Sequence, residues 1–262
     1  MIKVAVLGAC GKMGREVVKA VADANDIELV GACDVVSAGS SIGQIAGAPG
    51  LDVAVESDFD AMLNRCKPDV VVDFAKPFVL GNALSALERG AVPIIGTTGL
   101  SAHDLAELEN VSNRAGVAAM VIPNFAVGAV LMMKFAAEAA KYMPNAEIIE
   151  LHHDKKIDAP SGTAIKTAEM IDAARKQAGV EPDKPAGGDY PGRGEKRSGV
   201  QVHSVRLPGL VAHQEVLFGG TGQILTIRHD SIDRTSFMPG VLLAIRKARE
   251  ASGLVYGLDK LM

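Results

Sequence analysis

Polar side chains crowd the segment from residue 152 to 163, and their types suit chemistry on a small anion. His152 and His153 can donate a proton near neutral pH, and Lys156 carries a full positive charge. A helix is predicted to begin at Ser161-Gly162-Thr163, so Ser161 is the expected N-cap and the N–H groups of Gly162 and Thr163 form an anion site. The segment predicts a site for a small anionic substrate that gains a hydride and a proton.

A glycine-rich turn near the start of the chain predicts that a dinucleotide supplies the hydride. Gly8-x-x-Gly11-x-x-Gly14 directly follows the β-branched run 2–7 and opens a predicted helix, so the backbone can approach a pyrophosphate closely. Asp34 ends the next predicted strand, twenty residues beyond Gly14, where a carboxylate accepts hydrogen bonds from ribose hydroxyls. The cofactor-binding residues expected here are Gly8, Ala9, Cys10, Gly11, Lys12, Met13 and Asp34.

The residues after the second strand favour NADH over NADPH. Asp34 repels a 2′-phosphate and Val35 offers it no cation. Lys12, in the glycine-rich turn, can still reach such a phosphate, so use of both cofactors stays open.

Each of these features also has a plainer interpretation. The glycines can form a tight turn without a ligand, and Ser161 can be a helix cap only. The paired His152 and His153 with Asp154 can hold a metal, but the chain has no HExxH and no Cys/His set with ligand spacing. We therefore expect no metal.

The predicted helices and strands that position these residues follow one pattern in the first part of the chain and another in the second. Before about residue 124, short apolar runs alternate with helical segments, which predicts a doubly wound parallel sheet of the Rossmann type. The expected strands are 2–7, 27–33, 69–74, 92–96 and 117–122, and the expected helices are 15–24, 81–89 and 101–114.

The second part of the chain predicts an α+β domain with a mixed sheet. A strand at 146–151 and a helix at 164–178 precede a Gly-rich polar loop at 187–199. Three strands then follow without helices, at 200–207, 211–218 and 223–229, before a last helix at 236–250. We predict a dinucleotide-binding domain over 1–124, a substrate-binding and oligomerisation domain over 125–234, and a C-terminal helix within 235–262 that returns to the first domain.

Composition narrows the partners. A net charge of −4 argues against nucleic acid as a ligand. The apolar run 117–133 is interrupted by Pro123-Asn124 and Gly128, so a membrane span is not expected. Three cysteines do not form a disulfide scaffold, which favours a cytoplasmic setting.

The segment from Glu150 to Ala164 closely resembles the signature E-x-H-H-x-x-K-x-D-x-P-S-G-T-A of the 4-hydroxy-tetrahydrodipicolinate reductase family. This family, also called dihydrodipicolinate reductase, acts in diaminopimelate and lysine synthesis. The resemblance extends along the chain to Gly8–Gly14, to Asp73-Phe74 with Pro77, to Gly96-Thr97-Thr98-Gly99 and to Asn124–Gly128.

The resemblance implies that NADH or NADPH reduces a cyclic imine formed by dehydration of 4-hydroxy-tetrahydrodipicolinate. It implies His152 as proton donor, assisted by Lys156, and a homotetramer. The dicarboxylate would be held by His153, Ser161, Gly162, Thr163 and Thr98. The nicotinamide would lie near Gly96, Thr97, Thr98, Ile122, Pro123, Asn124 and Phe125.

Three residues depart from the family pattern. Cys10 replaces a glycine common in the family, Val35 stands where members that accept NADPH often carry arginine, and Lys76 occupies a place often held by arginine or a small polar residue. Two other functions would share part of this pattern. Another two-domain NAD(P) dehydrogenase, acting on an amino acid, would share the glycine-rich turn but not the 152–163 segment. A non-catalytic nucleotide sensor would need an effector module, and we find no helix-turn-helix or basic face.

Overall fold

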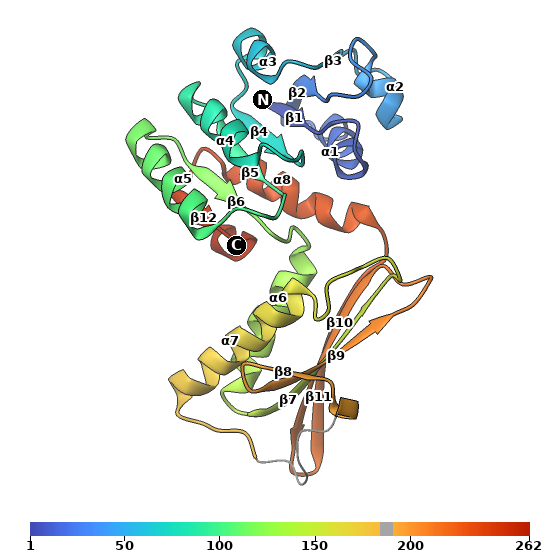
Figure 1. Ribbon diagram of the computed structural model, residues 1–262, viewed down its shortest axis with the longest axis vertical. Helices are drawn as coiled ribbons and strands as arrows, with labels where there is room; N and C mark the ends of the chain where they lie inside the picture. The colour runs from blue at the N-terminus through green and yellow to red at the C-terminus, as the bar shows by residue number, and fades with distance from the viewer. Residues whose placement is uncertain (184–190) are drawn as a thin grey trace. The chain divides into compact units, whose positions relative to one another are not determined.

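The computed structural model describes residues 1–183 and 191–262, which form two compact units (Figure 1). The first unit comprises residues 1–125 together with 237–262, and the second comprises residues 126–236.

A parallel sheet of seven strands forms the centre of the first unit, in the order β12-β6-β5-β4-β1-β2-β3. Its strands are β1 (Ile2–Leu7), β2 (Ile27–Cys33), β3 (Val55–Glu56), β4 (Val70–Asp73), β5 (Val92–Ile95), β6 (Ala119–Val121) and β12 (Leu254–Tyr256). The strand order reverses between β1 and β4, so the loops that follow these two strands lead to opposite sides. In open α/β sheets, ligands bind at such a point. The loops after β1 and β4 are therefore the expected position of a dinucleotide.

Helices cover both faces of this sheet (Figure 1). Helix α8 packs against α1 and β1, whereas α3, α4 and α5 form a series in which each contacts the next. The helices are α1 (Lys12–Ala22), α2 (Ile42–Ala46), α3 (Phe59–Cys66), α4 (Val79–Glu88), α5 (Ala102–Ala115) and α8 (Met238–Lys247), with a short 3-10 helix η3 (Leu258–Leu261) at the end. Burial on both faces explains why the central strands read as continuous apolar runs.

The second unit contains a mixed sheet in the order β11-β10-β7-β9-β8. Strands β7 and β9 are parallel, and the remaining neighbours are antiparallel. The strands are β7 (Asn145–His152), β8 (Glu195–Arg197), β9 (Val200–Arg206), β10 (Ala212–Gly220) and β11 (Gln223–Ser231), and two 3-10 helices are η1 (Pro191–Arg193) and η2 (Arg234–Phe237).

One face of this sheet packs against helices α6 (Val127–Ala140) and α7 (Gly162–Ala178), which lie side by side (Figure 1). Ile148 of β7, Val202 of β9 and Phe218 of β10 are buried in the core between the sheet and these helices. Because side chains alternate along a strand, Glu150 and His152 share the helix-covered face with Ile148.

Most of the predicted elements are present, with shifted ends. The first helix begins at Lys12 rather than Arg15, so Lys12 and Met13 belong to its first turn. The predicted loop 187–199 is partly wrong, because Glu195–Arg197 forms β8; residues 187–190 lie outside the described residues. Strands β3 and β12 and helices α2 and α3 were not predicted. No helix among the described residues is long and apolar enough to span a membrane.

Candidate active site

The turn between β1 and α1 brings backbone atoms so close together that side chains would not fit. Gly8 has φ of +75°, and a Cβ atom there would lie 3.1 Å from the backbone nitrogen of Ala75. A Cβ atom on Gly14 would lie 2.1 Å from the carbonyl oxygen of Gly8. The glycines therefore let the start of α1 pack directly on the turn, as in dinucleotide-binding folds.

Asp34, which follows β2, forms a hydrogen bond to this turn. Its Oδ2 accepts a hydrogen bond from the backbone N–H of Cys10 at 2.9 Å, and its Oδ1 accepts one from Val36 N–H at 3.0 Å. The carboxylate therefore fixes the conformation of the turn. Val35 is 88% exposed beside it.

The loops that follow β4, β5 and β6 meet through two aromatic rings. The Phe74 ring occupies the space next to Gly96, where a Cβ atom would lie 2.2 Å from ring carbon Cε1. The Phe74 and Phe125 ring centroids are 5.7 Å apart. These loops leave the carboxyl edge of the sheet, so the sequence-predicted residues Gly96 and Phe125 lie on the same edge as the glycine-rich turn.

Asp73 is the last residue of β4, and its buried side chain accepts a hydrogen bond from the backbone of the following loop. Its side chain is buried, and its carboxylate accepts hydrogen bonds from Ala75 N–H at 2.7 Å and from the Asn82 amide at 3.4 Å. Burial raises the pKa of Asp73 to about 6, although both hydrogen bonds act to lower it. The buried carboxyl group therefore changes charge near neutral pH.

Three features of this edge fit a dinucleotide. No side chain among residues 1–183 and 191–262 caps the start of α1, so its backbone N–H groups and helix dipole face the turn. Gly8 and Gly14 provide the close backbone approach. The buried hydroxyl of Thr97 has no hydrogen-bond partner among the described residues, and a bound polar ligand would supply one. Thr98, next to it, is exposed.

In the second unit, the buried carboxylate of Glu150 organises the end of β7. Both of its oxygens accept from Arg206, each at 2.8 Å, and Oε2 also lies 2.5 Å from Nδ1 of His152. Oε1 accepts the backbone N–H of Ser161 at 3.1 Å. Burial alone would raise the pKa of Glu150, but hydrogen bonds from His152, Arg206 and Ser204 outweigh it and lower the pKa to about 2. Glu150 is therefore ionised at neutral pH.

The loop between His152 and α7 is held at Asp158 and at Ser161. The Lys156 ammonium donates to both carboxylate oxygens of Asp158, at 2.8 Å each, and the Asp158 carbonyl oxygen accepts from Arg206 at 2.6 Å. At the far end Ser161 is buried and its hydroxyl caps α7 by accepting from Ala164 N–H at 3.2 Å. The predicted N-cap role of Ser161 is confirmed by this geometry.

The predicted substrate residues fall into two groups. His152, His153, Lys156 and Ser161-Gly162-Thr163 lie together at the end of β7 and the start of α7, with the His153 side chain exposed. Thr98 belongs to the first unit. The predicted cofactor residues 8–13, 34, 96–98 and 122–125 all lie in the first unit.

The contacts of His152 with Glu150 and Arg206 were not predicted from the sequence. For Glu150 a signal exists, because it lies two residues before His152 on one strand, and both side chains therefore point to the same face. Arg206 lies 54 residues after His152, and the β7–β9 register sets the two opposite each other. No local pattern marks such a contact.

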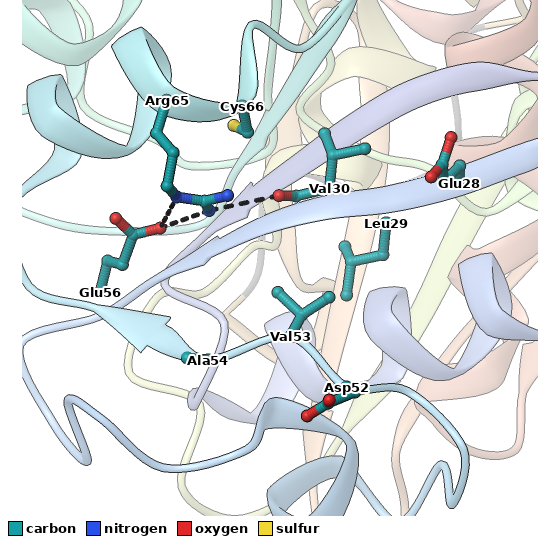
Figure 2. Close-up of a pocket in the computed structure, with 9 residues that line it drawn as sticks. All are labelled: Glu28, Leu29, Val30, Asp52, Val53, Ala54, Glu56, Arg65 and Cys66. Carbon is teal, nitrogen blue, oxygen red and sulfur yellow. Dashed lines mark hydrogen bonds and ion pairs between the residues drawn. The ribbon is translucent and has the colours of Figure 1, made fainter.

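A pocket elsewhere in the first unit contains none of the predicted site residues. It has a volume of about 470 Å³ and lies between β2 and the segment Asp52–Ala54. Arg65, one of its lining residues, donates to Glu56 and to the Val30 carbonyl oxygen (Figure 2). Strand β3 pairs with β2 only at Ala32 and Cys33, so the earlier part of the β2 edge lines this pocket.

Comparison with known structures defines the class first. A scyllo-inositol dehydrogenase from Lactobacillus casei matches all of this chain and 92% of its own, with a TM-score of 0.64 at 15% identity, and so shares the fold alone. The chain thus has a Rossmann-type parallel-sheet unit combined with a second, mixed-sheet unit. A dipicolinate-bound dihydrodipicolinate reductase from Paenisporosarcina is more similar, with a TM-score of 0.87 and 42% identity over 100% of both chains.

The sequence comparisons identify the family. The profile described as "Dihydrodipicolinate reductase, N-terminus" matches residues 2–125, and "Dihydrodipicolinate reductase, C-terminus" matches residues 128–262. A 4-hydroxy-tetrahydrodipicolinate reductase of Syntrophomonas wolfei is 52% identical over 99% of this chain and 98% of its own. The chain belongs to the dihydrodipicolinate reductase family, as its signature segment predicted.

Proposed function

We propose that this chain reduces 4-hydroxy-tetrahydrodipicolinate, through its dehydrated cyclic imine, to tetrahydrodipicolinate in diaminopimelate and lysine synthesis. The observation that carries the proposal is the His152–Glu150–Arg206 cluster beside the Ser161 helix start, in a chain that matches this family over its full length. In this proposal the first unit, predicted as 1–124 with the returning segment 235–262, binds the cofactor. The second, predicted as 125–234, binds the substrate.

Bound NADH or NADPH would supply the hydride. The glycine-rich turn from Gly8 to Met13, the start of α1 and Asp34 would hold its adenosine and pyrophosphate parts, since they provide N–H donors and a carboxylate. Residues 96–98 and 122–125 would hold the nicotinamide. NADH is the expected preference, because the exposed Val35 beside Asp34 offers no charge to a 2′-phosphate.

His152 would donate the proton from Nε2. Its Nδ1 lies against the ionised Glu150, which accepts a hydrogen bond from Nδ1–H and leaves Nε2 as the exchangeable position. Lys156 would assist as a second acid and as a cation; it now pairs with Asp158, an acceptor that it can exchange for a substrate carboxylate.

The substrate class follows from the donors in the second unit. His153, Lys156 and the N–H groups of Gly162 and Thr163 suit carboxylates, and Thr98 would complete the set. Dipicolinate, the ligand named for the Paenisporosarcina relative, is a small dicarboxylate of this kind.

The sheet of the second unit supports a homotetramer. Its face opposite α6 and α7 carries Ile149, Leu151 and Leu217, and the edge strand β11 adds Ile224, which is 77% exposed. A sheet face that combines these apolar side chains with ion pairs such as Glu215–Arg228 suits association with other copies of the chain. The cytoplasmic setting remains a prediction from the cysteine content.

The test is the His152→Ala variant in a coupled measurement of turnover and cofactor binding. We expect turnover of 4-hydroxy-tetrahydrodipicolinate to fall about 10²-fold or more while NADH affinity stays within about twofold. A dehydrogenase for another substrate would show no turnover in the wild type, and a sensor would bind NADH without turnover of any substrate.

A further inference from the structure

We infer that Glu150 and Arg206 are a positioning pair that holds His152 in one tautomer and fixes the 153–161 loop against it. The inference deepens the proposed function, and its kinetic test rests on that function; its spectroscopic test does not.

The geometry gives the pair two tasks. The Arg206 guanidinium donates hydrogen bonds to both Glu150 carboxylate oxygens, and its Nη2 also donates to the Asp158 carbonyl oxygen at 2.6 Å. Glu150 joins the two ends of the loop, because Oε2 lies 2.5 Å from Nδ1 of His152, which precedes the loop, and Oε1 accepts Ser161 N–H at its end. A single ion pair therefore links β7, β9 and both ends of the segment that carries Lys156.

The same pair controls where His152 carries its proton. Glu150 is fully buried and held ionised, so it accepts a hydrogen bond from Nδ1–H and donates none. The neutral imidazole is thereby restricted to the Nδ1–H tautomer, and Nε2 is the atom that takes up and releases the proton. Without the carboxylate, both tautomers become accessible and the imidazolium loses its anionic partner.

The other groups around His152 do not replace Glu150. On β9 the register partner is the cation Arg206, and on β10 it is the uncharged Ala212. The following loop contributes Lys156 and Asp158, which pair with each other. Removing the Glu150 charge would leave the cation Arg206 as the register partner of His152, and a cation disfavours a protonated imidazole.

The direct test is the tautomer of His152 in the wild-type chain, read from ¹⁵N shifts of labelled histidine and assigned by the loss of its signals in His152→Gln. We expect the Nδ1–H form to dominate when the ring is neutral. A dominant Nε2–H form would overturn the inference, whatever the substrate of the protein.

The kinetic test compares Glu150→Gln with Glu147→Gln. Glu147 lies on the same strand and contacts His203 and Arg193, but it is partly exposed and on the opposite face. For Glu150→Gln we expect kcat to fall about 10²-fold, NADH affinity to stay unchanged, and the loss of kcat/KM at high pH to begin at lower pH. Glu147→Gln should leave that pH dependence in place.

A purely structural role would give a different result. In that case Glu150→Gln would lower the rate equally at every pH and leave the high-pH limb where it is in the wild type. If Glu150→Gln does not fold, Arg206→Lys provides the second variant, because lysine keeps the charge but loses the two-pronged contact. Arg206→Lys with wild-type kcat and an unchanged histidine tautomer would also overturn the inference.

Discussion

Replacing Asp73 with asparagine tests the buried carboxyl group beside the predicted dinucleotide site. Asp73 is 2% exposed and accepts the Ala75 N–H. Asparagine has nearly the same shape, keeps an oxygen for Ala75, and carries no charge at any pH. The Asn82 amide can rotate to accept from the new NH₂ group. Asp73→Asn therefore removes the titration with little change in packing.

The size of the effect follows from the pKa. Burial raises the pKa of Asp73 from 3.8 to about 6. Because the folded-state pKa is the higher one, the stability that this group contributes is full below about pH 4 and is lost as the pH rises through about 6. The shift corresponds to about 3 kcal/mol at 1.36 kcal/mol per unit. The stability of Asp73→Asn relative to the wild type should rise by about this amount between pH 4 and pH 8.

Urea unfolding followed by far-UV circular dichroism measures the difference, since the chain has no tryptophan. The control is Asp26→Asn in the same unit: Asp26 is exposed, and its contact with Arg246 lowers its pKa, so this variant should show no rise with pH. A relative stability of Asp73→Asn that stays constant or falls from pH 4 to pH 8 would refute the reasoning.

Three further predictions concern the cofactor and the assembly. Gly14→Ala should weaken NADH binding at least tenfold, because the new Cβ atom would lie 2.1 Å from the carbonyl oxygen of Gly8. The control Gly81→Ala in α4 places its Cβ atom in open space and should leave NADH binding unchanged. Fluorescence titration with NADH measures the affinity of both variants. Val35→Arg should raise the ratio of NADPH to NADH affinity about tenfold by adding a partner for a 2′-phosphate, and an unchanged ratio would place that phosphate elsewhere. Ile224→Asp should lower the mass in light scattering from that of a tetramer, and an unaltered mass would exclude this strand from the interface.

The sequence was most informative where chemistry and local structure coincide. The bounds of β1 and β2 were predicted, because β-branched runs there end in a glycine turn and an acid. The start of α5 was also predicted within one residue, because the Ser101–Asp104 capping box that sets it consists of two local hydrogen bonds. The signature segment gave the family, because it is long and rich in polar residues.

The missed strands lack a local signal. Strand β3 has two residues and β12 has three, too few to show a period, and β12 exists because its backbone pairs with the distant β6. All three residues of β8 are charged and exposed, so it resembles a loop. The contact of Arg206 with Glu150 depends on the register between β7 and β9, which is set by the whole sheet rather than by either residue.

Cofactor oxidation on addition of 4-hydroxy-tetrahydrodipicolinate tests the central claim most directly. The purified chain should oxidise NADH in proportion to the substrate added and form tetrahydrodipicolinate, with NADPH used more slowly. A folded chain that binds NADH but oxidises neither cofactor with this substrate would contradict the proposed reaction.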